Sequence, residues 1–204
     1  MSHTSSKLIE LGSTAFRQPR AESHCRYIHG YQLKAEVTFA CNELDNNNWV
    51  FDFGGLKDLK HIYKTQFDHT LVIANDDQEI ELLKELNVRG LAQLRIMTGG
   101  VGIERFAEWC FKTADSFVDE ATNGRVWVES VTVYEHEDNF ASYNRSTIKA
   151  NEVVAPVKEE TKEDSAEETQ SPPAEEYSGG ARVGPDVRTG NYSDPFAGTT
   201  WGKS

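Results

Sequence analysis

The stretch Cys25-Arg26-Tyr27-Ile28-His29-Gly30-Tyr31 leads directly into ten residues of alternating polarity, residues 32–41. The apolar side of this alternation carries Leu33, Ala35, Val37, Phe39 and Cys41. Strict alternation with a period of two is typical of an antiparallel β-strand with one buried face. His29 and Tyr31 share the parity of the apolar residues, so both side chains are expected on one side of the sheet, at its end. A thiol, an imidazole and a phenol therefore converge near one place.

The segments on either side of this strand predict an α+β fold, in which an antiparallel sheet carries two or three helices on one face. Residues 49–53 are expected to pair with strand 31–41 in a hairpin, across the turn-forming residues 42–48. Further strands are expected at residues 7–17, 91–97 and 125–135. Helices are expected at residues 56–67 and 102–118, with a short helix between an Asp76-Asp77 cap and Gly90.

The composition divides the chain into a domain, residues 1–148, and an acidic tail, residues 149–204. From Glu152 to Glu176 there are nine acidic residues and two lysines, so this segment contributes −7 to the whole-chain charge of −12. Such a segment buries too little apolar surface to offset its ordering entropy, and we expect it to be disordered. Tyr192, Phe196 and Trp201 follow it and are interpreted either as a docking segment for a protein partner or as terminal residues without a role.

Several classes of protein are excluded by the bulk composition. No apolar run approaches the ~18 residues of a membrane helix, and the N-terminus has no signal pattern. Three cysteines are too few and too sparse for a disulfide framework, so a cytoplasmic location is expected. The acidic balance without a basic stripe argues against a nucleic-acid partner.

Cys25 lies between His24 and Arg26, and neighbouring positive charge lowers the pKa of a thiol and favours the thiolate. The alternative is an incidental loop cysteine. Asp68-His69 follows a predicted helix, and an aspartate can fix the tautomer of a histidine to give an acid/base unit. Adjacent residues of an extended segment point in opposite directions. Asp68 therefore acts either through a local turn or on the site of another subunit.

In chain order, Cys25…His29-Gly30, Asp68-His69 and Glu135 resemble the 6-pyruvoyltetrahydropterin synthase and 6-carboxytetrahydropterin synthase family. That family carries Cys-x-x-x-His-Gly-His, then Asp-His, then a late strand that ends in Glu. Residues 49–57 and 102–107 are also similar to it, and the resemblance covers residues 8–145. It implies a tunnelling fold whose subunits join their sheet edges into a barrel, as a homo-oligomer (trimer or hexamer) with active sites between subunits.

The resemblance implies a role for each motif residue. Cys25 is the catalytic base or nucleophile that acts on the pterin side chain, and Asp68 and His69 are the acid/base unit. Glu135 accepts two hydrogen bonds from the 2-amino and ring N–H edge of the pterin. A carboxylate matches that edge as it matches a guanidinium.

The resemblance also implies a zinc cofactor. The family holds it with a histidine of the first strand and both histidines of His-Gly-His, and these three positions carry Phe16, His29 and Tyr31 here. Zinc normally takes three or four protein ligands. We expect His29 to bind it with His24 as a substitute ligand, and a Tyr31 phenolate is the alternative.

Together these expectations describe a pterin-forming lyase that acts on 7,8-dihydroneopterin triphosphate and gives a 6-pyruvoyl- or a 6-carboxy-tetrahydropterin. One alternative is a zinc-deficient member that binds pterin without turnover. Another is a scaffold in which only the barrel and the tail matter. The presence of Cys25, Asp68, His69 and Glu135 together favours the two pterin-binding readings over the scaffold.

Overall fold

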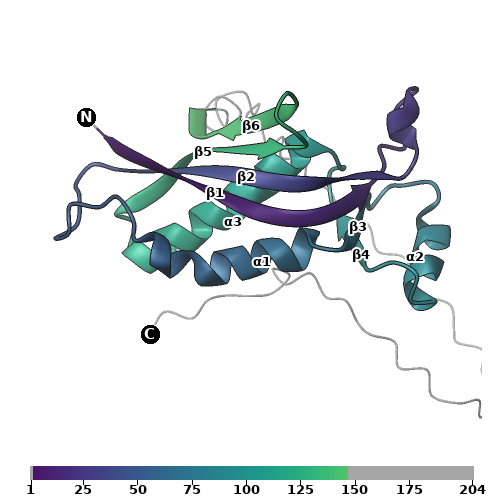
Figure 1. Cartoon of the computed structure of the whole chain (residues 1–204), viewed down its shortest axis with the longest axis horizontal. Coiled ribbons are helices and arrows are strands. Elements are labelled where there is room, and N and C mark those ends of the chain that lie inside the picture. Colours follow the sequence, from purple (N-terminus) through teal and green to yellow (C-terminus); the bar gives the residue numbers. More distant parts are fainter. Residues whose placement is uncertain (1, 147–204) are drawn as a thin grey trace, which may run out of the picture. The chain divides into compact units, whose positions relative to one another are not determined.

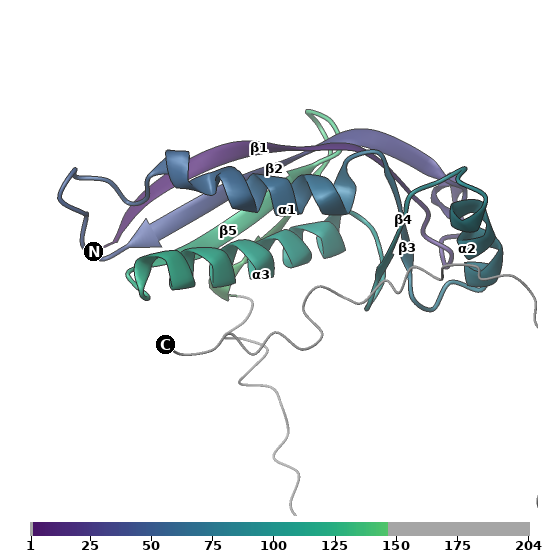
Figure 2. The ribbon, with the colours of Figure 1, turned by 90° about the horizontal axis from the view of Figure 1, so that it is seen from below.

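The computed structural model describes residues 2–146, which fold as a curved sheet over two long helices (Figures 1 and 2). The strands are β1 (His3–Phe16), β2 (His29–Cys41), β3 (Thr70–Ala74), β4 (Leu94–Met97), β5 (Val126–Tyr134) and β6 (Phe140–Asn144). The helices are α1 (Lys57–Phe67), α2 (Ile80–Val88) and α3 (Ile103–Thr122), with short 3₁₀ turns η1 (His24–Arg26) and η2 (Phe53–Leu56). The predicted α+β class is confirmed.

The sheet has the strand order β4-β3-β1-β2-β5-β6. The pairs β1–β2, β2–β5 and β5–β6 are antiparallel, as predicted. Strands β3 and β4 run parallel to β1 and to each other, so the sheet is mixed and the prediction of a purely antiparallel sheet was wrong at this end. The reason is connectivity, because α1 carries the chain from the β1–β2 pair back to the outer edge of β1.

Residues 49–53 do not form the predicted hairpin strand. Two aspartates bind backbone amides at the ends of this segment: the Asp45 carboxylate accepts from the Trp49 amide at 2.9 Å, and the Asp52 carboxylate accepts from the Gly54 amide, just beyond it, at 2.8 Å. Arg125 binds the Val50 carbonyl at 3.0 Å. With its polar groups already paired, the segment leads as a loop into η2 and α1 rather than joining the sheet.

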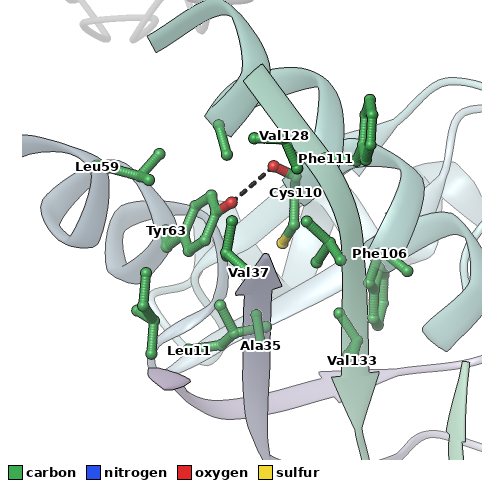
Figure 3. Packing of buried hydrophobic residues seen from close by; sticks show 14 of the residues in the cluster. Leu11, Ala35, Val37, Leu59, Tyr63, Phe106, Cys110, Phe111, Val128 and Val133 are labelled. Carbon is green, nitrogen blue, oxygen red and sulfur yellow. Dashed lines mark hydrogen bonds between the residues drawn. The ribbon is translucent and has the colours of Figure 1, made fainter. Parts of the chain in front are cut away.

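The main core lies between one face of β1, β2 and β5 and the helices α1 and α3. Buried residues recur at helical spacing in α3, which extends four residues beyond the predicted end at residue 118. Tyr63 of α1 is fully buried, and its hydroxyl donates to the Cys110 carbonyl of α3 at 2.6 Å (Figure 3). This bond satisfies the buried phenol and links the two helices.

Helix α2 packs on the opposite face of the sheet from α1 and α3, so two helices rather than three share one face. Val72 and Ala74 of β3 belong to the main core, whereas Leu71 and Ile73 form a second cluster with Leu83 of α2. Strand β3 is therefore buried on both faces, and its continuous apolar run lacks the alternation that identified β2.

No helix in the described part of the chain is long and apolar enough to cross a membrane. The boundary at residue 148, the acidic tail and its aromatic segment lie outside residues 2–146, so those predictions stay predictions.

Candidate active site

Cys25 lies in the loop that enters β2, at the end of the sheet where β1 finishes. The Gln18 amide donates to the Cys25 carbonyl at 2.9 Å, and the Ser23 side chain caps the η1 turn through the Cys25 amide. These bonds fold the loop back on itself and hold Cys25 partly buried. His24, its neighbour, is exposed.

Phe16, His29 and Tyr31 form an aromatic cluster beside this loop. Phe16 of β1 lies directly opposite His29 of β2, and their ring centroids are 4.7 Å apart. The His29 and Tyr31 rings meet edge to face at 5.7 Å. His29 Nδ1 lies 2.7 Å from the Tyr27 carbonyl. Because a carbonyl only accepts, Nδ1 carries the proton and Nε2 is the free nitrogen.

Glu135, immediately after β5, lies close to the same cluster. The pKa of Tyr31 is raised from its ordinary value by burial of the ring, and then by the charges of Glu135 and Cys25. Glu135 follows Tyr134, which pairs with Lys34, so its side chain lies on the same face of the sheet as Tyr31. Glu135 also lines a pocket with Gln18, whose backbone amide binds the Cys25 carbonyl, so the Cys25 loop, Tyr31 and Glu135 lie at the same end of the sheet.

A pocket of about 370 Å³ lies at Glu135, at the start of α3. Gln18, Gly102 and Glu104 line it together with the turn after β5. Gly102 has φ +127°, and a Cβ there would lie 2.6 Å from Nε2 of the Gln18 side chain. Gln18 and Gly102 were not singled out from the sequence as site residues. The glycine before α3 was the available signal, because it marks a close approach of side chain to backbone.

Asp68 and His69 form one hydrogen-bonded unit. Asp68 Oδ1 accepts from His69 Nδ1 at 2.9 Å and from the Ser13 amide at 3.2 Å. His69 has φ +58°, and its own amide donates to the Ser13 carbonyl at 2.7 Å. This left-handed backbone is the local turn that lets two adjacent side chains meet, one of the two arrangements left open by the sequence.

The unit formed by Asp68 and His69 makes no bond to Cys25 of the same chain. Across residues 2–146, no hydrogen bond or ion pair links either residue to Cys25. The His69 side chain is 83% exposed, so its ring faces away from the core.

A family model, 6-pyruvoyl tetrahydropterin synthase, matches residues 12–146. The chain belongs to this family. A 6-carboxy-5,6,7,8-tetrahydropterin synthase of Rickettsia typhi is 38% identical over 60 residues, which are 29% of this chain and 44% of that protein. The counterpart in Rickettsia bellii gives the same identity and coverage. The chain thus matches less than half the length of these curated relatives.

Solved structures support the family fold. An uncharacterised protein of Wolinella succinogenes superposes with a TM-score of 0.63 at 19% identity, over 71% of this chain and 99% of that one. A variant of Plasmodium vivax 6-pyruvoyltetrahydropterin synthase gives 0.51 at 15% identity, over 70% and 98%. These likenesses confirm the predicted tunnelling fold of the subunit.

Synthases of this family use a metal, but the residues present here do not fit one. Phe16 offers no donor atom, and among the described residues no three His, Cys, Asp or Glu side chains are grouped to hold an ion. His29 and His24 supply two imidazoles, short of the three or four protein ligands of a zinc site. The prediction of zinc on His29 and His24 therefore lacks a complete set of donors.

Proposed function

We propose that this chain is a pterin-forming lyase that acts on 7,8-dihydroneopterin triphosphate. The observation that carries the proposal is the placement of the Cys25 loop, Tyr31 and Glu135 at one end of the sheet, in a chain with the fold of this family. Of the two products, a 6-carboxy-tetrahydropterin is favoured by the names of the Rickettsia relatives.

Each residue has a distinct role in this proposal. The Glu135 carboxylate accepts two hydrogen bonds from the pterin edge and fixes the ring in the adjoining pocket. Cys25 transfers a proton at, or attacks, the pterin side chain. Asp68 orients the His69 ring through the 2.9 Å bond at Nδ1, so that Nε2 is the ring nitrogen left to exchange a proton with the substrate.

The site is completed by a second subunit. The exposed His69 ring, without any bond to its own Cys25, is available to the Cys25 of a neighbour. Strands β4 and β6 are the two edges of the sheet, and unpaired edges favour pairing between chains. A homo-oligomeric barrel with pterin sites between subunits is the assembly that accommodates both features.

Two variants separate binding from chemistry. Glu135→Ala is expected to weaken pterin binding by about 2–5 kcal/mol, because it removes one partner of a charge-assisted pair. Cys25→Ala is expected to bind pterin like wild type and to form no product. Binding is followed by titration calorimetry with a dihydropterin, and product by chromatography after incubation with dihydroneopterin triphosphate.

Glu137→Ala is the matched control, because Glu137 is an exposed carboxylate two residues further along the same turn. Equal pterin affinity in Glu135→Ala and Glu137→Ala would show that Glu135 is not the anchor. Wild-type protein that binds pterin without turnover would replace the lyase by the pterin-binding alternative.

A further inference from the structure

The three positions at which the family resemblance expects metal-binding histidines form a closed aromatic cluster in this chain. Phe16 and His29 pair across β1 and β2, and Tyr31 follows on the same face. The Phe16 and Tyr31 ring centroids are 6.2 Å apart, so all three rings are within contact distance of one another. A metal at this place would have to be held by these side chains.

Phe16 is a fixed part of the core. It is 1% exposed, and its ring meets Phe106 of α3 edge to face with a centroid separation of 5.1 Å. Phe106 in turn packs on Phe67 at 5.2 Å. Because this ring closes the helix side of the cluster, a ligand from another segment cannot take its position without opening the core.

The donors that remain are Nε2 of His29 and the hydroxyl of Tyr31. His29 Nδ1 is engaged with the Tyr27 carbonyl at 2.7 Å. Within residues 2–146, the Tyr31 hydroxyl has no hydrogen-bond partner. These two donors fall short of the three or four protein ligands that a zinc site takes, and the unpaired hydroxyl can donate a hydrogen bond.

We propose that this chain works without the histidine-bound metal of its family. In place of that metal, the Tyr31 hydroxyl donates a hydrogen bond to a side-chain oxygen of the reduced pterin. The first half concerns only the chain's own donors. The second half rests on the proposed function. Tyr31 is suited to the task because its hydroxyl is unpaired within residues 2–146 and its side chain lies on the same face of the sheet as Glu135, the group assigned to the pterin ring.

Zinc content tests the first half. Wild type, Tyr31→His and the double variant Phe16→His/Tyr31→His are incubated with zinc chloride, dialysed against metal-free buffer and analysed by mass spectrometry for zinc. The double variant completes three histidines and is expected to keep about one zinc per subunit. Wild type and Tyr31→His are expected to keep less than about a tenth of that.

Wild-type protein that keeps about one zinc per subunit after dialysis would overturn the metal-free site. A folded double variant without zinc would show that Phe16 and Tyr31 are not what excludes the ion. Circular dichroism checks folding, since Phe16 is a core residue. If the double variant does not fold, the zinc content of wild type still decides.

Tyr31→Phe tests the second half, because it removes the hydroxyl and keeps the ring. Its kcat is expected to fall about tenfold, as for one lost hydrogen bond, with a smaller change in pterin affinity. Tyr27→Phe is the control, since the Tyr27 ring is exposed and only its carbonyl touches His29. A chelator is expected to leave the wild-type rate unchanged.

An unchanged kcat in Tyr31→Phe, or inactivation of wild type by the chelator, would contradict the role of the hydroxyl. If wild type neither binds nor converts a pterin, the proposed function fails and the hydroxyl role fails with it. The zinc result stands in that case, because it is read from the protein alone.

Discussion

Gly12 makes room for Asp68 in the acid/base unit. Strand β1 shifts its register against β2 between Glu10 and Gly12, and Gly12 adopts φ +112°. A Cβ at this position would lie 2.2 Å from Asp68 Oδ1. The missing side chain therefore allows the carboxylate to reach both the Ser13 amide and His69 Nδ1.

Replacing this glycine should damage stability and activity together. Gly12→Ala forces an alanine into a left-handed conformation and pushes Asp68 aside, and we expect a loss of about 1–3 kcal/mol in unfolding free energy together with lost turnover. Denaturant melts and product assays measure the two effects.

Gly90→Ala is the control for backbone strain alone, because Gly90 has φ +71° with nothing within 4 Å of the added Cβ. If Gly12→Ala is no less stable than Gly90→Ala and keeps its activity, the close approach of Asp68 has no functional consequence.

The sequence predicted which face of β2 carries the candidate residues, but not how the side chains of the candidate site are arranged. Alternation placed His29 and Tyr31 on the core side of β2, and the resemblance to the family pointed to Asp68-His69. The pairing of Phe16 with His29 depends on the strand register, and the contact between Asp68 and His69 depends on one left-handed residue. Neither is encoded in a local pattern of polarity.

At the scale of elements, α3 and β5 are joined through one carboxylate. Strand β5 has a bulge where Thr38 and Phe39 of β2 face Ser130 and Val128. The Val128 amide donates to Asp115 Oδ1 at 2.9 Å, and Arg145, just after β6, binds the same oxygen and the Val128 carbonyl. A bulge that would leave β5 unpaired is thus tied to the helix.

Asp115→Ala should loosen this junction. It leaves a buried Val128 amide without an acceptor and Arg145 without its carboxylate, so we expect a loss of about 2–3 kcal/mol in unfolding free energy. Asp119→Ala, one turn further along the same helix at an exposed position, is expected to change it by less than about 0.5 kcal/mol. Equal denaturation midpoints for the two variants would contradict the role of Asp115.

Two elements with a clear periodicity of apolar residues were predicted, and two elements without one were missed. The alternation of β2 and the helical spacing of α3 identified both. Strand β3 has five buried residues in a row, so it shows no alternation, and β6 is a half-exposed edge strand of mixed polarity. Residues 49–53 look like a strand by composition. The Asp45 and Asp52 carboxylates instead bind the Trp49 and Gly54 amides, and the segment forms a loop.

At the scale of the whole molecule, the proposed site needs two chains. In the proposal one subunit contributes Cys25, Tyr31 and Glu135, and within residues 2–146 its own His69 is exposed and makes no hydrogen bond or ion pair with them. Pairing at the β4 and β6 edges would bring the Asp68–His69 unit of one subunit to the Cys25 loop of the next. The account therefore predicts that catalysis belongs to the oligomer and not to the isolated subunit.

Mixed oligomers of two inactive variants test this claim most directly. Cys25→Ala and His69→Ala are co-expressed with different affinity tags, the mixed assemblies are purified through both tags, and product formation is compared with that of each variant alone. If each site combines Cys25 of one subunit with His69 of another, random mixing restores about a quarter of the sites, and activity returns toward that fraction of wild type. Mixed oligomers that stay inactive, or a wild-type protein that sediments only as an active monomer, would contradict the account.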